Sequence, residues 1–96
     1  MVTINQVQEI VSRETKVELT AIRANSRKEN IIVARHLSMY FCRWYTEQSL
    51  LKIAAAHGKG THGTIINACS YVDSRKKTNT KFRETYEIIL TKIKTI

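Results

Sequence analysis

The chain has 96 residues, 43% of them hydrophobic and 25% charged, as expected for one folded domain with a buried core. Sixteen Lys and Arg against eight Asp and Glu give a net charge of +8, which attracts polyanions such as nucleic acid, anionic membrane or acidic protein. Two cysteines without a signal-peptide pattern indicate a reducing compartment, and the short apolar runs argue against a bilayer span. A secreted miniprotein, a membrane protein and a multidomain enzyme are therefore disfavoured.

The first third of the chain has the pattern of two helices and a loop. Thr3-Ile4-Asn5-Gln6 forms a capping-box sequence, and an apolar face at helical spacing follows it. A shorter helix fits residues 17–24. The segment 25–30 contains no apolar side chain and is predicted to be an exposed loop.

The strongest helical pattern begins at Ile31 and predicts a long central helix. Its apolar stripe consists of Ala34, Leu37, Phe41, Trp44 and Tyr45. These side chains are expected in the core, and Trp44 is therefore interpreted as a core residue rather than a base-stacking platform. Arg35, His36 and Arg43 lie off the stripe and are expected to face solvent or a partner.

The second half of the chain contains the only glycines, at positions 58, 60 and 63, and the chain has no proline. Ser49 is predicted to cap a fourth helix that Gly58 ends, and Thr61 to cap a fifth helix. Residues 78–80 interrupt the pattern before a last amphipathic helix over residues 82–93. The fold class is therefore all-α, with about six helices around a small core.

Two short helices joined by Gly58-Lys59-Gly60 make a candidate helix-turn-helix. In such motifs the second helix enters the major groove with its N-terminal residues at the base edges. The residues at that position here are polar or small: Thr61, His62, Gly63, Thr64 and Asn67. A helical hairpin with a solvated second helix is the alternative interpretation.

Three segments resemble the C-terminal DNA-binding domain of the bacterial replication initiator DnaA. Ile31–Phe41, with the sequence IIVARHLSMYF, is similar to the family's I-V-x-x-R-Q-I-A-M-Y-L helix. Ser49–Ile53 is similar to S-L-x-x-I-G, and His57–Ile65 aligns without gaps on the signature F-G-G-R-D-H-T-T-V. The resemblance covers nearly the whole chain. It implies the fold of that domain, a Trp-repressor-like helix-turn-helix arrangement.

The resemblance implies DNA-contact roles for the basic loop and the central helix. Arg27 matches the family arginine that reaches into the minor groove, and the negative potential of a narrow A·T-rich groove suits a guanidinium. Arg35 and Arg43 match positions that contact phosphate. His36 replaces the usual Gln and, as an imidazole, can still donate to phosphate.

The signature segment carries both matches and departures. The matches are His62 and Thr64, which the resemblance assigns to a thymine-rich base edge and to the DNA backbone, and one turn further on Asn67 can donate to phosphate or adenine. The departures are Gly60 for Arg, Thr61 for Asp and Gly63 for Thr, with Lys59 supplying a displaced charge. Because glycine cannot make the lost base contacts, a changed target sequence is expected.

The leading functional hypothesis is duplex DNA binding by a single helix-turn-helix domain spanning residues 1–96, with replication-initiator-like site recognition. The alternatives are a protein-interaction adaptor derived from the same fold and a small transcriptional regulator. The expected partners are double-stranded DNA and, secondarily, other replication proteins, with a monomer favoured and a cytoplasmic, nucleoid-associated location. No enzyme, cofactor or metal is expected, because neither a phosphate-binding G-x-x-x-x-G-K motif nor close Cys/His spacing occurs.

Overall fold

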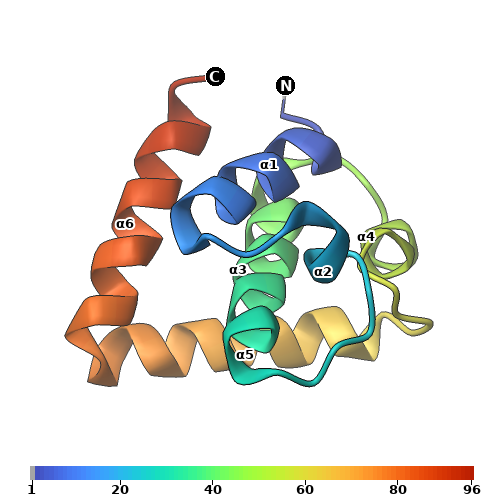
Figure 1. Ribbon diagram of the computed structural model, residues 1–96. Helices are drawn as coiled ribbons and strands as arrows, with labels where there is room; N and C mark the ends of the chain where they lie inside the picture. The colour runs from blue at the N-terminus through green and yellow to red at the C-terminus, as the bar shows by residue number, and fades with distance from the viewer. Residues whose placement is uncertain (1) are drawn as a thin grey trace.

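A computed structural model describes residues 2–96, which form six helices and no strand (Figure 1). The helices are α1 (Ile4–Thr15), α2 (Leu19–Ile22), α3 (Glu29–Tyr45), α4 (Leu50–Ala56), α5 (Gly63–Thr78) and α6 (Thr80–Lys94). Helix α3 lies at the centre, with α1 across it, α5 packed against its lower part and α6 to one side (Figure 1). The expected all-α class is confirmed. None of the helices in these residues has the length and hydropathy to cross a membrane.

Side-chain caps define several helix boundaries. The capping box of α1 is present: Thr3 Oγ1 accepts from the Gln6 N–H at 3.1 Å, and Gln6 Oε1 accepts from the Thr3 N–H at 2.9 Å. Ser49 caps α4 through the N–H of Lys52. The interruption between the last two helices is a single residue, since Asn79 ends α5 and also caps α6.

Four predicted helix starts are wrong by one or two residues. The helix predicted over residues 17–24 is only α2, Leu19–Ile22, and the last helix begins at Thr80 rather than at residue 82. Helix α3 begins at Glu29, where an acidic side chain suits the positive end of the helix dipole. Thr61 is not the cap of α5, because its hydroxyl lies 3.3 Å from the Thr64 hydroxyl instead of accepting from a backbone N–H. The N-cap is His62, without a side-chain capping bond, and α5 begins at Gly63.

The interpretation of Trp44 as a core residue is wrong, since its side chain is 54% exposed. The buried face of α3 continues from Phe41 to Tyr45, four residues on, and their rings lie 6.1 Å apart. Trp44 lies beside that face, in the last turn of the helix. Its ring contacts the Arg43 guanidinium, 4.7 Å from the ring centroid, and Tyr40.

Trp44→Ala is therefore expected to lower the free energy of unfolding by no more than about 1 kcal/mol, the size of an exposed cation–π contact. Urea unfolding measures this, with Phe41→Ala as the destabilised control because Phe41 is fully buried. A loss for Trp44→Ala equal to that for Phe41→Ala would mean that the indole contributes to the core after all.

Candidate nucleic-acid interface

The turn between α4 and α5 is built around Gly58. Its φ is +72°, the left-handed conformation that lets a chain leave a helix, and it follows α4 directly after the C-cap His57. The N–H groups of His57 and Lys59 both donate to the carbonyl of Ala54, at 3.0 and 2.9 Å. The predicted end of the fourth helix at this glycine is confirmed.

Gly58 also brings the turn against the basic loop, residues 23–28. A Cβ on Gly58 would lie 2.7 Å from the carbonyl oxygen of Arg23, closer than real Cβ atoms approach. Lys59 Nζ reaches across the same junction and donates to Asn25 Oδ1 at 2.5 Å. The two segments that the sequence assigns to different DNA grooves are therefore packed together (Figure 1).

The side chain of Arg35 hydrogen-bonds the backbone of the same loop. The expectation that it faces solvent is wrong. Its side chain is only 3% exposed. Nε donates to the Ile22 carbonyl at 3.2 Å, and Nη2 donates to the carbonyls of Ala21 and Ser26 at 3.4 and 3.1 Å. Carbonyls at a helix end lack helical partners, and the several donors of a guanidinium satisfy them together. Arg35 thus holds the end of α2 and the loop.

A hollow of about 440 Å³ lies between the basic loop, α3 and α5. Six predicted site residues line it: Arg27, Arg35, His36, Lys59, Thr64 and Asn67. Burial lowers the pKa of Lys59, and the charges of Arg35 and Arg27 lower it further. Because these cations repel one another, an anion in or at the mouth of the hollow would relieve the repulsion.

His36 forms one wall of this hollow in its neutral form. Its half-buried ring lies 4.6 Å from the ring of Tyr71, and its Nδ1 has no hydrogen-bond partner among the described residues. Burial lowers its pKa, with further lowering by Arg35 and Lys59. A neutral imidazole is a weaker phosphate donor than a cation, so its wall-forming contact with Tyr71 is the clearer role.

The other predicted site residues lie outside the hollow. Thr61 and His62 are exposed at the start of α5. Arg43 lies against Trp44. Burial raises the pKa of the Cys69 thiol, and Arg43 lowers it in part. The structure therefore gathers the candidates into three places: the hollow, the exposed first turn of α5 and the separate Arg43.

Sequence reasoning missed three residues that support this surface. Asn25 and Ser26 form part of the hollow. Gln8 of α1 is 2% exposed; its amide donates to the Ala56 carbonyl at the end of α4 and accepts from Arg23 Nε. A signal was available for Gln8, because it lies between Val7 and Val11 on the otherwise apolar side of α1.

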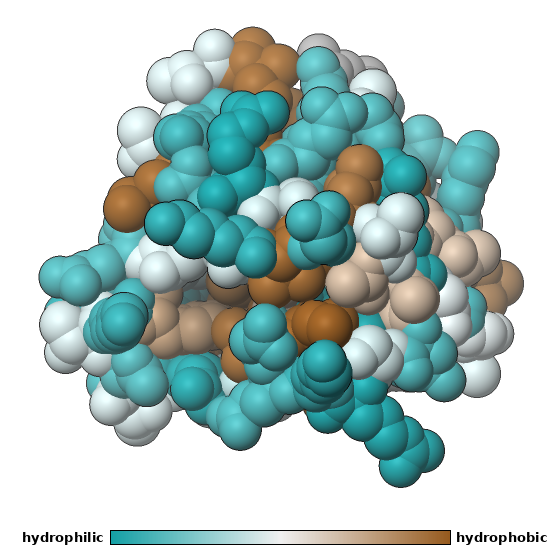
Figure 2. All heavy atoms as spheres, in the orientation of Figure 1, coloured by the Kyte–Doolittle hydropathy of each residue, from teal (hydrophilic) through white to brown (hydrophobic). Residues whose placement is uncertain are grey.

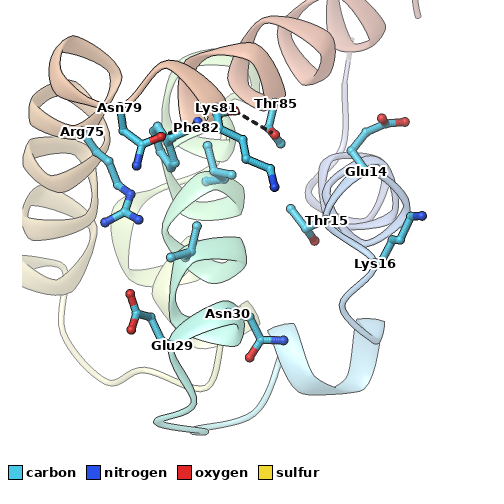
Figure 3. Close-up of a pocket in the computed structure, with 12 residues that line it drawn as sticks. Glu14, Thr15, Lys16, Glu29, Asn30, Arg75, Asn79, Lys81, Phe82 and Thr85 are labelled. Atoms are coloured by element: carbon cyan, nitrogen blue, oxygen red, sulfur yellow. Dashed lines mark hydrogen bonds between the residues drawn. The ribbon is translucent and has the colours of Figure 1, made fainter.

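A larger cleft of about 810 Å³ lies elsewhere, between the end of α1, the start of α3 and the α5–α6 junction (Figure 3). In Figure 2 hydrophilic residues surround a hollow whose floor is hydrophobic. The lining of this larger cleft mixes acidic with basic side chains, among them Glu14, Glu29, Lys16 and Lys81. This cleft contains none of the candidate DNA-contact residues.

Comparison with known sequences decides the family. A family profile described as the bacterial DnaA protein helix-turn-helix matches residues 4–72, from the start of α1 into α5. The chain belongs to this family. The DnaA family's helix-turn-helix is thus formed here by α4, the turn at Gly58 and α5.

Several curated relatives support the same assignment. Each is named chromosomal replication initiator protein DnaA. The Porphyromonas gingivalis protein is 34% identical over 86 residues, covering 90% of this chain and 18% of its own length. Those of Flavobacterium psychrophilum and Bacteroides fragilis are each 32% identical, covering 86% and 97% of this chain and 17% and 20% of their own. The chain therefore spans about a fifth of the length of these relatives.

Proposed function

We propose that this DnaA-family domain binds duplex DNA through α5 and the basic loop, as the site-recognising part of a replication initiator. The observation that carries the proposal is the packing of the helix-turn-helix turn against a basic loop, around a hollow lined by Arg27, Arg35 and Lys59. Phosphate supplies the anion that this cluster lacks, and a duplex presents phosphates beside both grooves. Binding of this kind requires no catalytic group or cofactor.

In this proposal the exposed start of α5 lies in the major groove. Thr61 and His62 then meet base edges, while Thr64 and Asn67 lie where the helix meets the hollow. Arg27 enters the adjacent minor groove, and Lys59 contacts the phosphate between the grooves. Arg43, half-buried on α3, supplies a separate phosphate contact.

The roles of Arg35 and His36 are modified from the first expectation. Both residues line the hollow. However, Nε and Nη2 of Arg35 already donate to backbone carbonyls, and the imidazole of His36 is neutral. We therefore assign them to the floor and wall of a phosphate site, where Arg35 adds charge more than direct hydrogen bonds. The strongest direct phosphate donors of the hollow are Lys59 and, at its edge, Arg27.

The test is the salt dependence of duplex binding combined with selection of sites from random duplexes. Affinity is expected to fall steeply between about 50 and 200 mM salt. Arg27→Ala is expected to lower the salt slope by about one and to relax any preference for an A·T-rich flank, because its guanidinium senses the narrow groove. Fluorescence anisotropy at several salt concentrations measures the slope.

Arg83→Ala is the matched control, because Arg83 is an exposed arginine on α6 outside the proposed surface. It removes the same charge and is expected to leave the slope and site preference unchanged. Equal effects of the two variants, with no preferred site, would reject the groove assignment. Weak, sequence-blind binding by the unmodified domain would favour the protein-interaction adaptor, whose motivation is the presence of glycine at positions 60 and 63.

A further inference from the structure

A buried polar chain connects α1 to both parts of the proposed DNA surface. Gln8 Nε2 donates to the carbonyl of Ala56 at 2.9 Å and lies 3.4 Å from His57 Nε2. Gln8 Oε1 accepts from Arg23 Nε at 2.8 Å. One side-chain amide therefore contacts the end of α4, just before the turn, and the first residue of the basic loop.

On the turn side of this series of hydrogen bonds, both ring nitrogens of His57 are paired. His57 Nδ1 lies 2.7 Å from the Ile53 carbonyl and donates its proton there, which leaves Nε2 to accept. Ser38 Oγ lies 2.7 Å from that Nε2 and is its donor. Ser38 and His57 stand where the family motifs quoted above have Ala and Phe, so two departures from the motifs are hydrogen-bonded to each other.

The loop side is held twice by α1. Besides its bond to Gln8, Arg23 donates through Nη2 to Asn5 Oδ1 at 2.5 Å. Asn5 and Gln8 are three residues apart and share one side of the helix. The guanidinium thus docks along α1, while the Arg23 carbonyl faces Gly58. Arg23 joins the loop, the turn and α1.

We propose that Gln8 is a positioning residue that sets the spacing between the helix-turn-helix turn and the basic loop, so that α1 governs contacts in both DNA grooves. The proposal rests on the proposed function for its effect on DNA. Its structural reason is local: a buried amide with paired donor and acceptor holds its two neighbours at a fixed separation, whereas an apolar side chain of similar size leaves their polar groups unpaired. Gln8 itself touches no DNA.

Two substitutions distinguish the two hydrogen bonds of the Gln8 amide, one to Ala56 and one from Arg23. Gln8→Met keeps a side chain of similar length but removes both hydrogen bonds. Gln8→Glu keeps an acceptor for Arg23 but has no donor for the Ala56 carbonyl, so it removes only the hydrogen bond that precedes the turn. Gln48→Met, in the exposed segment before α4, is the matched control for the change of residue type.

Gln8→Met is expected to weaken binding to the best selected duplex by about tenfold, because the turn and the loop lose the amide that fixes their spacing. The salt slope and the affinity for a scrambled duplex are expected to stay unchanged, because the substitution removes no charge. Gln8→Glu is expected to keep the flank preference attributed to Arg27 while relaxing the major-groove preference. A wild-type ratio of specific to scrambled affinity in Gln8→Met would overturn the proposal.

Amide hydrogen exchange tests the positioning without DNA. Gln8→Met is expected to speed exchange in the turn (residues 57–60) and in the basic loop together, while α6 keeps its protection. Gln8→Glu is expected to speed exchange in the turn only. Unchanged exchange in both segments would overturn the proposal even if the domain bound no DNA. Absence of duplex binding with the expected exchange pattern would reject the proposed function and leave the positioning role intact.

Discussion

Gly58→Ala is expected to lower the free energy of unfolding by about 2–4 kcal/mol and to abolish specific duplex binding. Two costs add. The left-handed backbone at φ +72° disfavours any residue with a Cβ, and that Cβ would meet the Arg23 carbonyl oxygen at 2.7 Å. Since the oxygen belongs to the backbone, relief requires the basic loop to move away from the turn.

Gly60→Ala is the control within the same turn. A Cβ on Gly60 has no heavy atom within 4 Å and its φ is not positive, so the substitution is expected to be neutral or slightly stabilising. Urea unfolding and duplex binding of both variants give the comparison. If the two variants had the same stability, the close approach of turn and loop would not contribute to the fold.

The helices were predictable because their signals are local. Periodic apolar residues, the capping box at Thr3 and the glycine at position 58 determine boundaries through nearby backbone groups. The single residue between α5 and α6 is also local, since Asn79 can cap the following helix while the preceding one ends. The six-helix fold therefore follows from the sequence almost without tertiary information.

The orientation of side chains on α3 was harder to predict, for a tertiary reason. Other helices surround the middle of α3, so a charged residue off its apolar stripe is not thereby exposed. Arg35 is buried because the carbonyls of Ala21, Ile22 and Ser26 meet it there. At the last turn the surroundings are one-sided, and Trp44 is exposed although it is apolar. Periodicity describes one helix and omits its neighbours.

The candidate site was predicted in its parts and not in its arrangement. Residue types and the family resemblance selected Arg27, Lys59 and Asn67, which do line one hollow. The support behind them comes from contacts distant in sequence, such as Gln8 with Ala56. No local pattern specifies such pairs, and a polar residue on an apolar face is the one available hint.

His57 is fully buried, and we expect it to make the domain sensitive to acid. Burial lowers its pKa from 6.5 to about 4, and the nearby charges of Arg35 and Arg23 lower it further, while the Ile53 carbonyl opposes the shift. Above pH 6.5 the imidazole is neutral in both the folded and the unfolded chain. Its pairing is then undisturbed.

As the pH falls below 6.5, the unfolded chain binds a proton that the folded chain does not, so stability is lost until the pH nears 4. The difference between the two pKa values corresponds to about 3 kcal/mol at the acid end. Urea midpoints measured through this range are expected to show the loss.

His62→Ala, which removes an exposed imidazole, is expected to show the same loss of stability as the unmodified domain. His57→Phe combined with Ser38→Ala replaces the polar pair by the apolar pair of the family motif and is expected to remove most of the decline between pH 6.5 and 5. An undiminished decline in that double variant would mean that other groups, such as carboxylates, cause the acid sensitivity.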